Sequence, residues 1–413
     1  MRTSQTHLPS LLSGILFSLS GLFLFGIGLF PGVTALLSLF TGKSIEVQQT
    51  IIFIAFGFEA ALLFAAAFFS FQKTLQKPSA DQETIVSVTR WQIVILVLIA
   101  GASILIGNQV SGIGTVNWLV LPILTLPAVV LPLVVILMLG TQQLPLGTRW
   151  QSWSVLGLGM TLTPFVLLIL EAVVAIILFF VIIAYVATQP ELVFELRGLS
   201  RQIMILGPDS EAAFDLLAPL LTRPGVILTA LTYMAILVPA IEELFKPLGV
   251  WLLAGRLDST AQGFTLGALS GAGYALIETI GVSTQAGEWA SLLFSRIGTG
   301  LLHITTSAMM GAAIVLAWRE RHYMRLIGTY FLAFLLHGLW NMFAILFTFS
   351  SLAELLGQPG RLSTIQPTLI VIMSLLAVGL FAILLVSNRK MRRMVSLPFI
   401  EESTPANTVD QSP

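Results

Sequence analysis

The sequence contains no cysteine, and only 10% of its residues are charged, far below the roughly 25% typical of soluble domains. The lack of cysteine excludes disulfides, thiolate nucleophiles and cysteine-ligated metals. Histidine is scarce as well, with four in 413 residues, whereas hydrophobic residues make up 56% and the mean hydropathy is +0.95. The formal net charge of zero removes nucleic acid as a default partner. The composition therefore predicts a polytopic membrane protein whose surroundings are the lipid bilayer.

The hydropathy pattern predicts an all-α fold, a bundle of about ten transmembrane helices, because one crossing needs roughly 20 apolar residues. In the sixth of these segments, Pro239 and Pro247 give the helix a physical reason to bend. The ten segments are 10–31, 49–72, 91–107, 117–140, 157–187, 225–254, 262–281, 296–318, 326–348 and 368–388.

Basic residues gather between the predicted helices in a pattern that indicates topology. They lie in the 73–90 loop, at Arg149, at Arg256, in 319–325 and in 389–393. With ten crossings and a cytoplasmic N-terminus, all five positions fall on the cytoplasmic side, as the positive-inside rule requires. We therefore expect an integral membrane protein with both termini in the cytoplasm.

The same reading divides the chain into five parts. The first part holds helices of unknown role, the second is an external loop with amphipathic stretches, and the third holds helices six to nine. An external loop with the last helix and a disordered cytoplasmic tail complete the chain. These parts span 1–190, 191–224, 225–348, 349–390 and 391–413.

A glutamate pair and a lysine, Glu242, Glu243 and Lys246, interrupt the sixth segment. Charged residues at the centre of a membrane helix cost roughly 2.5–3.5 kcal/mol each, so a chain that retains them there usually uses them. Glu242 and Lys246 are four residues apart and share a helix face, which allows an ion pair. Glu243 is rotated by about 100°. The two carboxylates are therefore expected to have different tasks, and the spacing leaves open which one faces the reacting centre.

The seventh segment repeats glycine at 263, 267 and 271, a stripe that allows another helix to approach closely. Glu278 lies seven residues beyond the last of these glycines, on nearly the same face, with Tyr274 four residues before it. We therefore expect the Glu278 carboxylate in the interior of the bundle, where the Tyr274 hydroxyl can donate to a neighbour.

The eighth and ninth segments each carry a histidine among small or polar residues. His303 lies in a stripe with Thr299 and Ser307, and His337 is four residues before Asn341 on one helix face. Four successive helices thus present polar groups to a common interior.

Two chemistries suit these side chains, and both hydrolyse an acyl bond, which we expect to be a peptide bond. His303, His337 and Glu278 could hold a divalent metal such as zinc with a position open for water. Alternatively, a glutamate acts as general base on water without metal, while the histidines and Asn341 donate to the oxyanion. The sequence has no metal-binding HExxH motif, so the metal stays open.

The ordered motifs Glu-Glu-x-x-Lys (242–246), Tyr-x-x-x-Glu (274–278), an intramembrane His303 and His-x-x-x-Asn (337–341) resemble the PrsW family of intramembrane proteases. This family is similar in turn to the CAAX-processing endopeptidases, and the resemblance covers roughly 225–348. It implies endoproteolysis of membrane-anchored proteins such as bacterial anti-sigma factors, and a bacterial plasma membrane location. The expected catalytic and supporting residues are Glu242, Glu243, Glu278, His303, His337 and Asn341, with Lys246 and Tyr274 in support.

Two alternatives remain at this stage. Further intramembrane carboxylates, Glu59 and Glu171, would suit a proton- or ion-coupled transporter or channel. A catalytically inactive relative that acts as a scaffold would carry the same motifs without cleaving a substrate.

Overall fold

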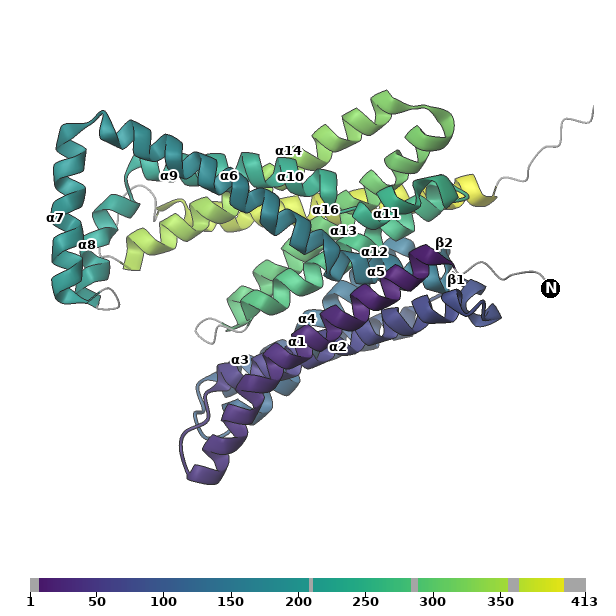
Figure 1. Cartoon of the computed structure of the whole chain (residues 1–413), viewed down its shortest axis with the longest axis horizontal. Helices are drawn as coiled ribbons and strands as arrows, with labels where there is room; N and C mark the ends of the chain where they lie inside the picture. Colours follow the sequence, from purple (N-terminus) through teal and green to yellow (C-terminus); the bar gives the residue numbers. More distant parts are fainter. Residues whose placement is uncertain (1–6, 208–210, 284–288, 356–363, 397–413) are drawn as a thin grey trace, which may run out of the picture.

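Long helices make up nearly all of the computed structural model, which describes residues 7–207, 211–283, 289–355 and 364–396 (Figure 1). Within these residues the only sheet is a two-stranded ribbon. Nine continuous helical stretches among the described residues are long and apolar enough to cross a membrane. The predicted all-α membrane bundle is therefore confirmed.

The N-terminal part is a group of four long helices. α1 packs along α2, and α3 packs against α4. Gly42, in the left-handed conformation at φ 66°, ends α1, and Thr89 caps α3 through a reciprocal capping box with Gln92. The bounds are α1 (Leu8–Thr41), α2 (Val47–Thr74), the 3₁₀ helix η1 (Pro78–Asp81), α3 (Arg90–Ser111) and α4 (Asn117–Thr141).

A short antiparallel ribbon, β1 (Glu83–Ile85) with β2 (Pro145–Thr148), lies at the end of the bundle where α1 begins (Figure 1). β2 leads directly into α5 (Arg149–Met160), which is followed by α6 (Leu162–Ala187). Thr161 separates these two helices with non-helical dihedral angles. The fifth predicted crossing is thus two consecutive helices rather than one.

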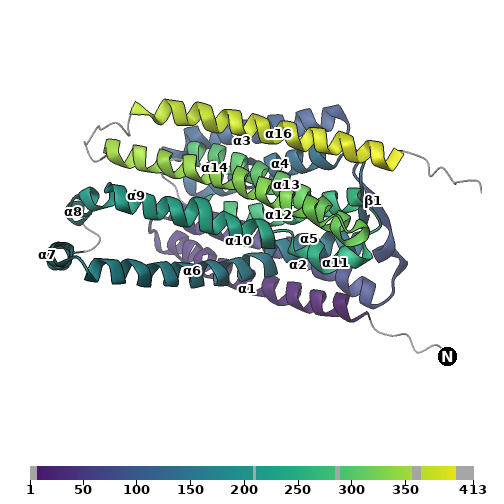
Figure 2. The same cartoon turned by 90° about the horizontal axis from the view of Figure 1, so that it is seen from above.

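Two further helices fill the segment predicted as a loop outside the membrane, α7 (Pro190–Leu206) and α8 (Glu211–Leu221). α7 runs across the direction of the long helices, at the end of the bundle opposite the ribbon (Figures 1 and 2). An ion pair between Arg223 and Glu195 ties α7 to the chain that follows α8.

The sixth crossing is broken into pieces around the two prolines. Pro239 has no backbone N–H for the carbonyl of Ala235, and the preceding turn is a π-helix, a form common at functional sites. Pro247 ends the next helix. The pieces are α9 (Pro224–Leu231), the π-helix η2 (Thr232–Leu237), α10 (Val238–Phe245), α11 (Leu248–Leu253) and the 3₁₀ helix η3 (Ala254–Arg256).

The last four long helices are α12 (Thr260–Ser283), α13 (Trp289–Glu320), α14 (Tyr323–Leu355) and α16 (Gln366–Ser396). α12 is not among the nine apolar spans, since glycine, serine and threonine lower its hydropathy. Its 24 residues nevertheless extend about 36 Å, and it packs against α13, α5 and α4 in the interior. With α12 included, each of the ten predicted segments corresponds to one continuous helical stretch of the structure.

The glycine stripe of α12 brings it against α13. A Cβ atom at Gly267 would lie 2.2 Å from the carbonyl oxygen of Ser307, and one at Gly271 would lie 2.3 Å from that of His303. Gly311 of α13 meets the backbone of Gly263 in the same way. The predicted role of the stripe in close helix packing therefore agrees with these contacts.

α1 begins and α16 ends at the same end of the bundle (Figure 1). An even number of crossings has this consequence, which agrees with the count of ten. The basic residues Arg319, Arg389 and Lys390 belong to helix ends on this side.

Candidate active site

Four helices bring their polar side chains to one buried point. α10 and the residue after it contribute Glu242, Glu243 and Lys246, α12 contributes Tyr274 and Glu278, α13 contributes His303, and α14 contributes His337. Except for Glu278, each of these residues is at least nine-tenths buried. The sequence-predicted constellation is thus a single cluster in the structure, apart from Asn341.

Glu243 has two partners on different helices. Its Oε1 atom accepts hydrogen bonds from the ammonium of Lys246 and, at 2.8 Å, from Nδ1 of His337. Both side chains of the Glu243–Lys246 pair are completely buried. Because Nδ1 of His337 donates its proton here, Nε2 of that ring carries the lone pair.

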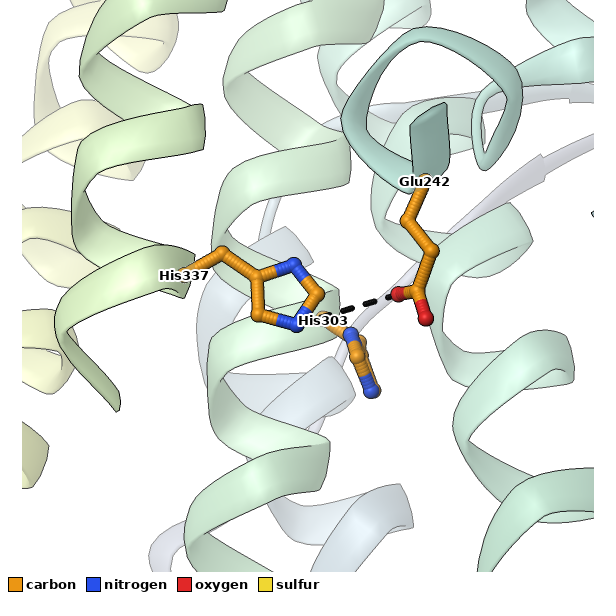
Figure 3. Close-up of side chains that lie close together, drawn as sticks. All are labelled: Glu242, His303 and His337. Carbon is orange, nitrogen blue, oxygen red and sulfur yellow. Dashed lines mark ion pairs between the residues drawn. The ribbon is translucent and has the colours of Figure 1, made fainter. Parts of the chain in front are cut away.

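Glu242 has a different environment, as its rotation around the helix predicts. The hydroxyl of Tyr274 donates to its Oε1 atom at 3.0 Å. Its Oε2 atom is buried and accepts no hydrogen bond, although it lies 3.8 Å from Nε2 of His337 (Figure 3). Lys246, expected to pair with Glu242, is 3.7 Å from this oxygen and closer to Glu243. The two glutamates therefore have separate partners.

His303 is held from the opposite direction. Its Nε2 atom donates to Oε2 of Glu278 at 2.7 Å, and Oε1 of Glu278 pairs with Arg296 at 2.9 Å. Nδ1 of His303 then carries the lone pair, which accepts from Lys246 at 2.9 Å. The rings of His303 and His337 are in edge contact, with centroids 5.3 Å apart.

The chemistry of this donor set fits a divalent metal ion. Glu242, His303 and His337 each offer a ligand atom, and these three atoms lie within 4.8 Å of one another. Two imidazole lone pairs and a carboxylate oxygen without a hydrogen bond thus converge (Figure 3). Acceptors that face one another are stabilised by a cation, which here is the ammonium of Lys246, 2.9 Å from Nδ1 of His303 and 3.7 Å from Oε2 of Glu242. Two histidines with one carboxylate also form a known zinc set.

The sequence predicts Glu278 as the third ligand. In the structure it accepts a hydrogen bond from Nε2 of His303, the ring nitrogen that does not face the candidate metal position. Glu243 likewise accepts from Nδ1 of His337, while Nε2 of that ring is the nitrogen available to a metal. A carboxylate that accepts from the far nitrogen of a ligating histidine fixes its tautomer and orientation and raises its basicity. The cluster has three carboxylates and two cations, Lys246 and Arg296, so one negative charge remains when the histidines are neutral.

Lys246 and a bound metal ion would compete for one acceptor atom, Nδ1 of His303. The ammonium of Lys246 donates to Nδ1 of His303, the same lone pair that an ion would use. An ion bound there would therefore exclude this hydrogen bond, while the ion pair of Lys246 with Glu243 could persist.

Two residues named from the sequence lie at the edge of the cluster. Asn341 donates its side-chain amide to the backbone carbonyl of Met234 in the π-helix at 2.8 Å. The backbone of Glu171, in α6, accepts from the hydroxyl of Tyr233 in the same π-helix at 3.1 Å. These bonds join η2 to the helix of His337 on one side and to α6 on the other.

The sequence reasoning did not assign two further residues. Arg296 pairs with Glu278, and Ser270 donates its hydroxyl to the carbonyl of Lys246 at 2.7 Å. The signal for Ser270 was present in the sequence, because 270, 274 and 278 are four apart on one face of α12. Arg296 lies seven residues, two helical turns, before His303.

A family model described as PrsW family intramembrane metalloprotease matches residues 150–378, which is more than half of the chain. The match begins in α5 and ends within α16, so it includes every residue of the cluster. No curated protein and no solved structure matches the chain.

Proposed function

Since this chain belongs to the PrsW family of intramembrane metalloproteases, we propose that it hydrolyses a peptide bond of a membrane-anchored protein at the cluster of Glu242, His303 and His337. The chain is an integral membrane protease. Membership in a protease family favours hydrolysis over the alternatives of ion-coupled transport and an inactive scaffold. The observation that carries the assignment to these residues is the convergence of three buried acceptor atoms from three helices.

Glu242, His303 and His337 are the residues that would hold a divalent ion, with zinc as the expected metal. When bound, such an ion would lower the pKa of water and polarise the carbonyl of the substrate. The other members of the cluster keep these three side chains in place. Glu278 and Glu243 each fix one histidine, and Tyr274 orients Glu242 through its Oε1 atom.

Without an ion, Oε2 of Glu242 is the atom to which we assign the proton of the attacking water; with an ion bound, the same oxygen would be a ligand. It is buried, and no hydrogen bond occupies its lone pairs. Oε2 of Glu243 also lacks a hydrogen bond within the described part of the chain, but Lys246 and His337 both donate to its Oε1 atom, and hydrogen bonds to the charged form make a carboxylate a weaker base. This assigns different tasks to the glutamate pair, with Glu242 toward the reacting centre and Glu243 in support.

The expected substrate is a protein with a single membrane span, of the anti-sigma-factor type that the family resemblance suggests. Residues 225–348 would form the catalytic core, and both termini would lie in the cytoplasm of a bacterial cell. Support for this orientation comes from the basic residues at the end of the bundle where α1 begins and α16 ends (Figure 1).

The test is cleavage of a panel of single-span substrates by purified protein in liposomes, with the metal content measured on the same samples. Glu242→Gln should lower kcat/KM by about 10³-fold or more, because the change removes a metal ligand or, in the metal-free mechanism, the proton acceptor. Glu59→Gln, a change to a buried glutamate in α2, is the matched control and should cleave as wild type. Full cleavage by Glu242→Gln would overturn the proposal. If activity survives complete removal of metal, the reaction does not need a metal ion.

A further inference from the structure

A cavity of about 420 Å³ lies between α12, α13, α14 and α16, where α14 begins and α16 ends. It does not include any residue of the active-site cluster. Figure 2 shows the same helices side by side along the bundle. The lining residues are Thr260, Phe264, Met309, Ala312, Ala313, Leu316, Arg325, Gly328, Thr329, Leu332, Ser387, Lys390 and Met391.

The floor of the cavity is apolar. Phe264 is 1% exposed, and Ala312 and Met391 are both 8% exposed. Leu316 and Leu332 add aliphatic surface from α13 and α14. An occupant with a hydrocarbon part would remove this surface from contact with water or loose lipid.

The rim of the cavity is basic. Arg325 and Lys390 are exposed, and among the residues that the structure describes neither side chain has a hydrogen bond or an ion pair. Their neighbour Arg319, in contrast, donates to the backbone carbonyls of Leu257 and Asp258. Three residues with hydroxyl groups, Thr260, Thr329 and Ser387, also line the cavity. Two unused cations with hydroxyl donors form a suitable environment for a phosphate.

The position of these groups along the helices matches the membrane interface. Arg325 is the third residue of α14, and Lys390 is six residues before the end of α16. Both helices are apolar spans, so their charged ends lie where lipid headgroups begin. The apolar floor extends from this level toward the centre of the bundle.

We propose that this cavity binds one anionic glycerophospholipid, with the phosphate between Arg325 and Lys390 and an acyl chain against Phe264, Leu316 and Leu332. Basic pockets between transmembrane helices are suited to such headgroups. A small soluble anion would use the rim but gain nothing from the floor. The bound lipid would join α16 to α13 and α14, the helices of the two active-site histidines, and this inference does not depend on the hydrolytic mechanism.

The test measures lipid binding to the full-length protein after delipidation in detergent, by native mass spectrometry. Phosphatidylglycerol is compared with phosphatidylcholine of the same chain length and with inorganic phosphate. Wild type should retain phosphatidylglycerol at least tenfold more tightly than phosphatidylcholine. The double variant Arg325→Gln/Lys390→Gln should weaken phosphatidylglycerol binding roughly 30-fold, the combined contribution of two cations.

Two further variants distinguish binding in this cavity from non-specific attraction of an anionic lipid to positive charge. Arg321→Gln/Arg393→Gln removes the same charge near the same end but outside the cavity lining, and should change binding by no more than about twofold. Gly328→Leu fills the cavity, since a Cβ at Gly328 meets nothing within 4 Å, and should abolish binding without loss of charge. Equal affinity for both lipids, an equal loss in the control, or phosphate binding as tight as the lipid would overturn the proposal.

Discussion

Glu243 in α10 and Glu59 in α2 are both buried, at 0% and 1% exposure, but within the part of the chain that the structure describes only Glu243 has hydrogen-bond partners, all of them at its Oε1 atom. Glu243 accepts from Lys246 and His337. Neither oxygen of Glu59 has a hydrogen-bond partner among the described residues. The C-terminal helices therefore surround their buried carboxylates with cations and imidazoles, whereas the N-terminal group leaves one carboxyl without support.

The two parts also differ in how their helices are covered. In α13, 89% of the most apolar stretch is buried, although it has the lowest mean hydropathy of the nine spans. In the crossing that contains α6, Arg149–Ala187, the stretch with the highest mean hydropathy is only 6% buried. In this protein the most hydrophobic helices are thus the ones exposed to lipid, while the more polar helices form the protein interior.

The largest effect on stability is expected from Lys246→Met, which leaves Glu243 buried without its cation. The free energy of unfolding should fall by about 3–5 kcal/mol, as measured by denaturation in mixed detergent. Lys73→Met removes the exposed ion pair with Asp81 and should cost less than about 1 kcal/mol. The double variant Lys246→Met/Glu243→Gln should recover much of the loss, and no recovery would contradict the pairing.

A glycine in each part tests the closeness of helix packing. Gly267→Ala places a methyl group 2.2 Å from the carbonyl of Ser307, so α12 and α13 must separate, at a cost of about 1–3 kcal/mol. Gly57→Ala in α2 meets nothing within 4 Å and should be neutral or slightly stabilising. The measurement is the midpoint of thermal unfolding of both variants. Equal midpoints would show that the close contact between α12 and α13 does not determine the stability of the protein.

Intermediate effects are expected from substitutions of the two carboxylates that accept hydrogen bonds from the histidines. Glu278→Gln and Glu243→Gln should each lower metal affinity or kcat/KM by about 10–100-fold, because each histidine loses its charged partner. This is smaller than the effect of Glu242→Gln, whose carboxylate is a direct ligand in the proposed site. A metal titration of each variant gives the order, and a loss for Glu278→Gln as large as for Glu242→Gln would return Glu278 to the ligand set.

The smallest effect is expected from Glu59→Leu. Replacement of a buried carboxyl without hydrogen bonds by an apolar side chain should leave stability unchanged or raise it by up to about 1 kcal/mol. Substrate cleavage should stay within twofold of wild type. Strong destabilisation would indicate that Glu59 has a partner outside the described residues, and the contrast between the two regions would then disappear.

The sequence predicted the membrane bundle and most of the cluster because both depend on local patterns. Long apolar runs define the crossings, and residues four apart, such as Tyr274 and Glu278, must share a helix face. The partners of each carboxylate could not be predicted in this way. Lys246 can reach Glu242 at i,i+4 or Glu243 at i,i+3, and the choice depends on His337, which is 94 residues away from Glu243 along the chain.

Other features required the packing of whole helices. Asn341 shares a face with His337, as predicted, but its amide reaches the π-helix because Gly338 lets α14 approach the carbonyl of Ala235. Arg296 reaches Glu278 only because α12 and α13 are in close contact. Neither arrangement follows from hydropathy or from the spacing within one helix.

The modest hydropathy of α12 has a consequence for the synthesis of this protein. Insertion of a helix from the translocon depends on its own free energy of transfer into lipid, and α12 has a large share of glycine, serine and threonine. Its stable position is against α13, which the ribosome makes later. The two helices are therefore expected to enter the bilayer together, so the catalytic centre forms only after both have left the ribosome.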